Sequence, residues 1–151
     1  MTPWLFVLLA ASGGAGAALR FVVDGVLRSR LRTTFQWATT IINVSGSLVL
    51  GVLTGLTAGR MLPTELGIVL GTAFLGGYTT FSTASYETVQ LIREGRKAAA
   101  FISGVVMLVA SVGAAIAGLW AIAVVVALLA PPLRDLAPRD PDPAPAAEVV
   151  S

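Results

Sequence analysis

Four long stretches of the chain carry no charged residue, and this feature limits the possible folds more than any other. The stretches cover residues 1–19, 33–59, 66–86 and 98–133. An α-helix rises about 1.5 Å per residue and needs about 20 residues to cross about 30 Å of hydrocarbon. Each stretch is therefore long enough, or nearly so, for one membrane crossing. In agreement, 56% of the 151 residues are apolar and only 12% are charged, so we predict an all-α membrane protein.

Four transmembrane helices are expected, and together they form one membrane domain over residues 1–130. They are predicted at about 3–27, 36–58, 64–92 and 98–130. The first begins without a positively charged segment, so we expect it to be retained and not removed as a signal peptide. Six of the eight prolines lie between Pro131 and Pro145. Residues 131–151 are therefore predicted to form a disordered, proline-rich tail.

The sequence contains neither cysteine nor histidine, and this excludes several kinds of chemistry. Thiolate nucleophiles, imidazole bases, zinc sites, and haem or iron–sulfur centres need one or the other. The net charge is only +2, and the basic residues stand at the ends of apolar segments. Such flanking charges are typical of membrane helices, so no nucleic-acid binding is predicted.

The middle of the third predicted helix contains weak helix formers. Residues 76–80 read Gly-Gly-Tyr-Thr-Thr, and we expect the helix to be broken there. Non-helical backbone at membrane depth is tolerated only where it is buried in protein or lines a cavity. Carbonyl groups freed from a helix are suitable ligands for a hard cation such as Na⁺. The segment from Gly76 to Thr80 is therefore predicted to be a site.

Small and polar residues recur every four positions along the second predicted helix. They form one slanted stripe, which consists of Asn43, Ser47, Gly51, Gly55 and Gly59. For the glycines we favour helix packing, since small residues let membrane helices approach closely. Asn43 differs because a buried amide must find polar partners. It is predicted to face a polar pathway or to lie at an interface.

Three charged residues are candidates for positions inside the membrane: Arg20, Asp24 and Glu87. Arg20 either serves a functional site, or extends to the lipid headgroups, or pairs with Asp24 one helical turn away. Thr80, Thr83 and Glu87 share one helical face, so hydroxyl groups would lead towards a carboxylate. The alternative is that these hydroxyls bond to backbone carbonyls one turn back.

Three motifs, one in each of the first three predicted helices, resemble those of the Fluc family of fluoride channels. They are Gly-Gly-Ala-Gly-Ala-Ala-Leu-Arg at 13–20, Asn-Val-Ser-Gly-Ser at 43–47, and Gly-Gly-Tyr-Thr-Thr-Phe-Ser-Thr-Ala-Ser-Tyr-Glu at 76–87. The resemblance covers about residues 4–125. It implies a passive, fluoride-selective channel, and not an enzyme. Such a channel would lie in the bacterial cytoplasmic membrane and export fluoride, which reduces fluoride toxicity. It also implies an antiparallel, dual-topology dimer with two pores.

The resemblance further implies roles for individual residues. A structural Na⁺ at the dimer centre would be held by the backbone carbonyls of Gly76 and Thr79. The anion pathway would be formed by Phe81, Asn43, Ser82, Thr83 and Glu87, with Arg20 at its entrance. Aromatic edges carry the positive part of the ring quadrupole, and amide and hydroxyl groups donate hydrogen bonds. Together such groups can replace the water around a fluoride ion.

Two positions depart from the family pattern. Members usually have a second Phe three residues after the first, where this chain has Ala84, and Phe101 stands where a Tyr is expected. One alternative is therefore a non-conducting or single-pore partner subunit of a heterodimer with a paralogue; another is a homodimer that tolerates Ala84. A small proton-coupled exporter is a further alternative, although residues 1–19 lack the carboxylate on which such proteins rely.

Basic residues are unevenly distributed between the two sides of the predicted bundle. The links on one side carry six: Arg28, Arg30, Arg32, Arg93, Arg96 and Lys97. The other side carries three: Arg60, Arg134 and Arg139. The excess predicts that the first set is cytoplasmic and that both termini lie outside. A chain that inserts in both orientations should be closer to balance, so the bias favours a heterodimer.

Overall fold

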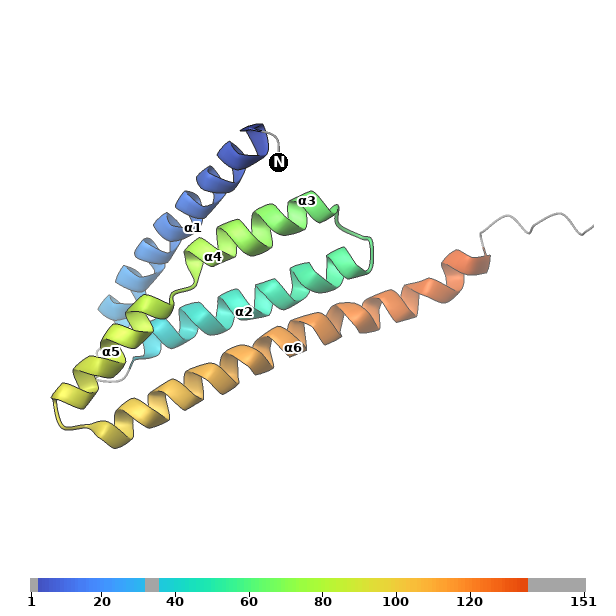
Figure 1. Ribbon diagram of the computed structural model, residues 1–151. Helices are drawn as coiled ribbons and strands as arrows, with labels where there is room; N and C mark the ends of the chain where they lie inside the picture. The colour runs from blue at the N-terminus through green and yellow to red at the C-terminus, as the bar shows by residue number, and fades with distance from the viewer. Residues whose placement is uncertain (1–2, 32–35, 136–151) are drawn as a thin grey trace, which may run out of the picture.

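The computed structural model describes residues 3–31 and 36–135, which are helical apart from short links. Figure 1 shows the helices in space. In chain order they are α1 (Pro3–Arg30), α2 (Trp37–Ala58), α3 (Thr64–Gly67), the π-helix η1 (Ile68–Phe74), α4 (Leu75–Tyr78), α5 (Phe81–Arg93) and α6 (Lys97–Asp135). No strand occurs among the described residues, so the prediction of an all-α fold is confirmed for them.

Three helices of the described chain are long and apolar enough to cross a membrane: α1, α2 and α6 as far as Leu129. The third predicted crossing, 64–92, consists of four shorter segments in succession, from α3 to α5. The fourth helix begins at Lys97 and continues to Asp135, past its predicted end at residue 130. Residues 136–151, which make up most of the predicted tail, lie outside the described part of the chain.

The break in the third crossing is shorter than predicted, and the expectation that it includes the paired glycines is wrong. Gly76 and Gly77 belong to α4, and the helical conformation is lost at Thr79 and Thr80. Their ψ angles are 160° and 123°, which is extended backbone. Gly77 serves close packing, because a Cβ there would overlap the backbone carbonyl of Gly13 in α1.

The segment before the break is a π-helix of seven residues, Ile68–Phe74. In a π-helix each N–H bonds to the carbonyl five residues back, and such segments are rare and occur frequently at functional sites. α1 packs along η1 and α4, and its Ser12 Oγ donates a hydrogen bond to the Val69 carbonyl at 3.0 Å. Residues 68–74 are mostly apolar, so periodicity in the sequence gives no signal for this segment.

α2 and α6 form the most extensive helix pair and lie side by side (Figure 1). The glycine stripe of α2 faces α6, because Cβ atoms added at Gly51 and Gly55 would overlap the Ala115 carbonyl and the Ile122 side chain. α6 contributes Gly118, where an added Cβ would overlap the backbone of α2. The interpretation that these glycines serve helix packing is therefore confirmed.

The turns after α2 and α5 use the same hydrogen-bond pattern. After α5, Gly95 has a φ of 75°, and the Arg96 N–H bonds to the Leu91 carbonyl at 2.9 Å. This is the Schellman motif, which satisfies the last carbonyls of a helix and favours glycine at the positive φ. After α2 the corresponding position is Arg60, with a φ of 56°. Each turn reverses the chain, so after two reversals α6 runs in the same direction as α2.

One end of the bundle brings four helix ends together. The C-terminal ends of α1 and α5 and the N-terminal ends of α2 and α6 lie there (Figure 1). This arrangement is the one that four crossings require if the links near 28–32 and 93–97 share a side. We call it the charged end, since it carries Arg28, Arg30, Arg93, Arg96 and Lys97.

Candidate functional site

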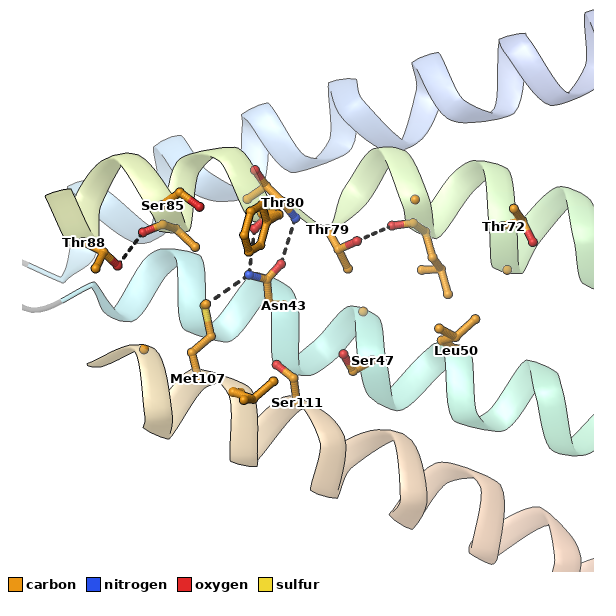
Figure 2. A pocket seen from close by; sticks show the side chains of 18 of the residues that line it. Asn43, Ser47, Leu50, Thr72, Thr79, Thr80, Ser85, Thr88, Met107 and Ser111 are labelled. Atoms are coloured by element: carbon orange, nitrogen blue, oxygen red, sulfur yellow. Dashed lines mark hydrogen bonds between the residues drawn. The ribbon is translucent and has the colours of Figure 1, made fainter. Parts of the chain in front are cut away.

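Asn43 of α2 lies beside the break and bonds to both polar backbone groups of Thr80. Its Oδ1 accepts the Thr80 N–H at 2.8 Å, and its Nδ2 donates to the Thr80 carbonyl at 3.0 Å (Figure 2). The side chain thus replaces helical partners that the break removes; an unpaired buried group would cost about 1–3 kcal/mol. The Nδ2 also lies 3.3 Å from the Met107 sulfur. A thioether is a weak acceptor, so this second proton is only weakly engaged.

Two backbone carbonyl oxygens at the break, those of Gly76 and Thr79, accept no hydrogen bond from the described residues. In a continuous helix the Thr80 N–H would reach back to Gly76, but here it bonds to Asn43. The Thr83 N–H would reach Thr79 in the same way, but it bonds to the Thr80 hydroxyl. Two free carbonyls without a carboxylate form a hard, uncharged donor set. Such a set fits a monovalent cation better than a divalent one.

Arg20 of α1 contacts the segment next to the break. Its Nε donates to the Gly77 carbonyl oxygen at 3.2 Å. Asp24 is paired with Arg28 at 2.8 Å, so the alternative in which Arg20 pairs with Asp24 is wrong. A guanidinium carries five N–H donors. One bond to the backbone therefore leaves most of them for water or an anion.

The first turn of α5 carries a cluster of three hydroxyl groups. Thr80 caps this helix, and its Oγ1 accepts the Thr83 N–H at 3.2 Å. The same Oγ1 donates to the Thr83 Oγ1 at 3.0 Å and lies 3.3 Å from the Ser82 Oγ. Thr80 and Thr83 therefore bond to each other, and the alternative of bonding one turn back is wrong for them. It holds for Thr88, whose hydroxyl donates to the Ala84 carbonyl at 2.8 Å.

An open groove with a volume of about 920 Å³ runs past the break, between α2, the third crossing and α6 (Figure 2). It brings together four of the predicted site residues: Asn43, Gly76, Thr79 and Phe81. Four others do not line it: Arg20, Ser82, Thr83 and Glu87. The groove has further polar residues that the motif roles did not include: Ser47, Thr72, Ser85, Thr88 and Ser111. α5 therefore carries polar groups on two different faces.

Phe81 and Ala84 line the same groove but differ greatly in exposure. Phe81 begins α5, and 86% of its surface is exposed, whereas Ala84 is 3% exposed. The rest of the described chain therefore leaves the Phe81 ring almost entirely uncovered. Ala84 contributes only a methyl group to the groove at the position where the family pattern expects a second aromatic ring.

Glu87 lies at the charged end and connects three helices. Its Oε1 accepts from Arg28 Nη2 of α1 at 2.5 Å, and its Oε2 accepts from the Thr39 hydroxyl of α2 at 2.7 Å. The motifs indicated Glu87 but neither partner. A signal for Thr39 existed, because it stands one helical turn before Asn43 on the same face. Arg28 resembles an ordinary flanking charge, and its role depends on how α1 crosses α5.

Two further hydrogen bonds join residues that are distant in sequence. The Ser45 Oγ and the Tyr78 hydroxyl lie 3.1 Å apart and connect α2 to α4. Ser103 of α6 is 1% exposed and donates to the Gln36 Oε1 at 2.8 Å. Through these contacts α2 is hydrogen-bonded to both the third crossing and α6.

These features define a class: a helical, multi-pass membrane protein whose third crossing is interrupted by a polar break beside an open groove. Residues 7–119 match the family model described as "CrcB-like protein, Camphor Resistance (CrcB)". The chain belongs to this family.

Several relatives whose names state a function resemble this chain over most of their length. The chain is 52% identical over 120 residues to "Fluoride-specific ion channel FluC 1" of Leifsonia xyli subsp. xyli, covering 80% of this chain and 88% of the relative. It is 44% identical over 126 residues to "Fluoride-specific ion channel FluC" of Nitrobacter winogradskyi, covering 81% and 98%. It is 41% identical over 117 residues to "Fluoride-specific ion channel FluC 1" of Streptomyces avermitilis, covering 78% and 93%. The family predicted from three motifs is thereby confirmed.

Proposed function

We propose that the protein is a passive, fluoride-selective channel through which fluoride leaves the cell across the bacterial cytoplasmic membrane. Family membership and relatives named as fluoride-specific channels support this function. The observation in this chain that carries the proposal is the pairing of Asn43 with both backbone groups of Thr80. This pairing keeps a non-helical, polar segment in place next to Phe81, at the interruption of the third crossing.

The groups around the break suit a small, strongly hydrated anion. Such a pore must replace the ion's water with several weak positive contacts. The Phe81 ring can present its positive edge, and the Asn43 amide has a weakly engaged N–H. The Ser82 and Thr83 hydroxyls supply stronger donors. Arg20 raises the local anion concentration at the entrance and does not itself bind the ion in the constriction. Transport of this kind requires no catalytic step.

A structural Na⁺ is the cofactor that the break fits. The carbonyls of Gly76 and Thr79 accept no hydrogen bond from the described residues, and both residues line the groove. Two carbonyls are too few for one cation, since hard cations take about six oxygen ligands. A partner subunit, either a second copy or a paralogue, related by a twofold or pseudo-twofold axis would add two more. Flux measured with Na⁺ replaced throughout by N-methylglucamine should therefore fall, whereas flux unaffected by this exchange would argue against the ion.

An antiparallel dimer accounts for the open groove. The groove is lined mainly by small and apolar residues, and Phe81 protrudes at its edge. A partner subunit would cover this surface and bring its own ring to the pathway. Antiparallel pairing would also place equivalent break carbonyls opposite one another, as a shared Na⁺ requires.

Ala84 and the uneven distribution of basic residues favour a heterodimer with a paralogous subunit. In a homodimer both pores would lack the second ring, whereas a two-Phe partner would leave one pore complete. Six basic residues on one side against three on the other favour a single orientation for this chain. The competing arrangement is a homodimer that tolerates Ala84.

The function is tested by fluoride efflux from liposomes that contain the purified protein, read with a fluoride electrode and compared with chloride. Fluoride flux without chloride flux is expected, at the same rate with and without a proton gradient. Strict dependence on a proton gradient would indicate an exporter instead of a channel.

The subunit arrangement is tested in a fluoride-sensitive bacterial host. If the channel is a heterodimer, this chain alone should not restore growth on fluoride, and co-expression with its paralogue should. Full rescue by this chain alone would exclude the heterodimer and leave the fluoride channel intact.

A further inference from the structure

The Glu87 carboxylate poses an electrostatic problem for a channel that carries anions. It lies one helical turn after Thr83 in α5, and its side chain is only 11% exposed. A fixed negative charge in such surroundings repels an approaching anion, and protein screens this repulsion less than water does. Left uncompensated, the carboxylate would oppose the flux that the proposed function requires.

Arg28 of α1 lies directly against this carboxylate. Its Nη2 donates to the Glu87 Oε1 at 2.5 Å, which makes an ion pair between α1 and α5. The second oxygen, Oε2, accepts from the hydroxyl of Thr39, a residue that is 1% exposed. Both oxygens of Glu87 are thus occupied, and one of them faces a full positive charge.

Asp24 holds the guanidinium of Arg28 in this position. Its Oδ2 accepts from the Arg28 Nε at 2.8 Å, one helical turn earlier in α1. A guanidinium is planar and its donors are fixed in direction, so the two bonds together define one orientation. This matters because the Arg28 side chain is half exposed. Without a second bond such a side chain would turn readily into water.

We propose that Arg28 is a positioning residue that cancels the charge of Glu87 where the anion pathway opens at the charged end. The inference rests on the proposed fluoride channel and adds to it a residue outside the three family motifs. Arg28 acts through Glu87 and need not touch the ion. The carboxylate keeps its contact with Thr39, while its repulsion of fluoride is removed.

A purely structural tie between α1 and α5 predicts a different result. Removal of either partner breaks a tie, and removal of both does not restore it. Charge cancellation is asymmetric. Loss of Arg28 alone uncovers the carboxylates of Asp24 and Glu87, whereas loss of Arg28 together with Glu87 leaves only that of Asp24 uncovered, which is not on the polar face of α5. Asp24 offers a matched control, since Asp24→Asn removes the same charge from the same cluster but not from the polar face of α5.

The first test is a double-mutant cycle on fluoride efflux from liposomes, with the full chain and any paralogue that wild-type flux requires. Arg28→Gln should lower the flux by about tenfold when Glu87 is present, and by less than about twofold in a Glu87→Gln background. Adding Asp24→Asn to Arg28→Gln should recover less flux than adding Glu87→Gln does. Size-exclusion chromatography in detergent verifies that each variant is folded.

A second test works on one folded sample, because the chain has no cysteine of its own. Arg28→Cys places a thiol at a half-exposed position. A thiol reagent that adds a trimethylammonium group should raise the flux of this variant several-fold, and one that adds a sulfonate should not. Equal effects of the two reagents would overturn the proposal.

The outcomes separate this inference from the proposed function. An equal loss from Arg28→Gln with and without Glu87 would overturn charge cancellation, and so would a Glu87→Gln channel without flux, because the carboxylate itself would then be required. If the wild-type protein conducts fluoride and Arg28→Gln conducts it equally well, this inference is overturned and the proposed function stands. Absence of wild-type fluoride flux, with or without a paralogue, would remove the proposed function and this inference with it.

Discussion

The α2–α6 pair and the break between α4 and α5 both hold helices together without help from water, but by opposite means. Along α2 and α6, contact depends on side chains that are missing, since Cβ atoms at Gly51 and Gly118 would overlap the facing backbone. At the break, contact depends on one side chain that is present, the Asn43 amide. Lipid supplies no hydrophobic force between helices, so close packing and buried polar bonds must do this alone. Added bulk should therefore damage the first region, and removed polarity the second.

The largest effect is expected from Gly51→Leu in the close-packed pair. The side chain would overlap the Ala115 carbonyl, and a backbone carbonyl cannot move aside. Overpacking of an interior costs about 1–3 kcal/mol even where neighbours can adjust, so we expect little folded protein. The recovery of a single monodisperse species in detergent measures this. Gly113→Leu on α6 is the control, since an added Cβ there meets open space; equal loss in both variants would contradict the packing argument.

The next largest effect is expected from Phe81→Ile at the break. The change keeps apolar bulk but removes the positive ring edge, so fluoride flux should fall by about 100-fold, or 2.7 kcal/mol in barrier height. Phe81 is 86% exposed, so the fold of the chain should survive, as the elution profile would report. Phe21→Ile, which alters a ring on α1 that is 79% exposed, is the matched control. Normal conduction by Phe81→Ile would refute the aromatic account.

A smaller effect is expected from Asn43→Ala, which removes the amide and keeps the glycine stripe. The N–H and carbonyl of Thr80 would lose their partner, each at a cost of about 1–3 kcal/mol. We expect about tenfold less fluoride flux and a lower unfolding temperature by circular dichroism. Ser47→Ala, one turn further along α2, is the control. If flux is unaltered in Asn43→Ala, Asn43 belongs with the packing residues after all.

The smallest effect is expected from Ser12→Ala, which removes the hydrogen bond from α1 to the Val69 carbonyl in η1. One such bond contributes about 1 kcal/mol, and the carbonyl also has a helical partner. Flux should change by less than about twofold, while the unfolding temperature falls slightly. A loss of flux as large as that of Asn43→Ala would show that η1 controls the break more tightly than its hydrogen bonds suggest.

The parts of the fold that could be predicted are those that depend on local spacing. Uncharged stretches located the crossings, and the four-residue spacing of Gly51 and Gly55 predicted a packing stripe that α6 indeed fills. The paired glycines misled, because Gly76 and Gly77 are weak helix formers in isolation, yet α1 packs closely enough to keep Gly77 helical. Propensity was overridden there by a tertiary contact.

The site was predictable where its residues belong to recognisable motifs, and not where it depends on helix crossings. Asn43 and Phe81 were identified, and they meet at one groove. Arg28 was not, because its contact with Glu87 joins residues 59 positions apart. Nothing local distinguishes such an arginine from one that flanks a membrane helix. Whether each motif residue conducts fluoride remains a prediction that the experiments above address.

The π-helix at Ile68–Phe74 sets the angular phase of everything that follows it in the third crossing. Successive residues of an α-helix are about 100° apart around its axis, so a deletion in α4 would turn the Thr79 carbonyl relative to η1. A deletion inside η1 differs, because a π-helix bonds five residues back and an α-helix four. Loss of one residue there can be absorbed by a return to α-helical bonding, with both flanks kept in place. Such a deletion would therefore shorten the crossing by one residue without turning the Gly76 and Thr79 carbonyls.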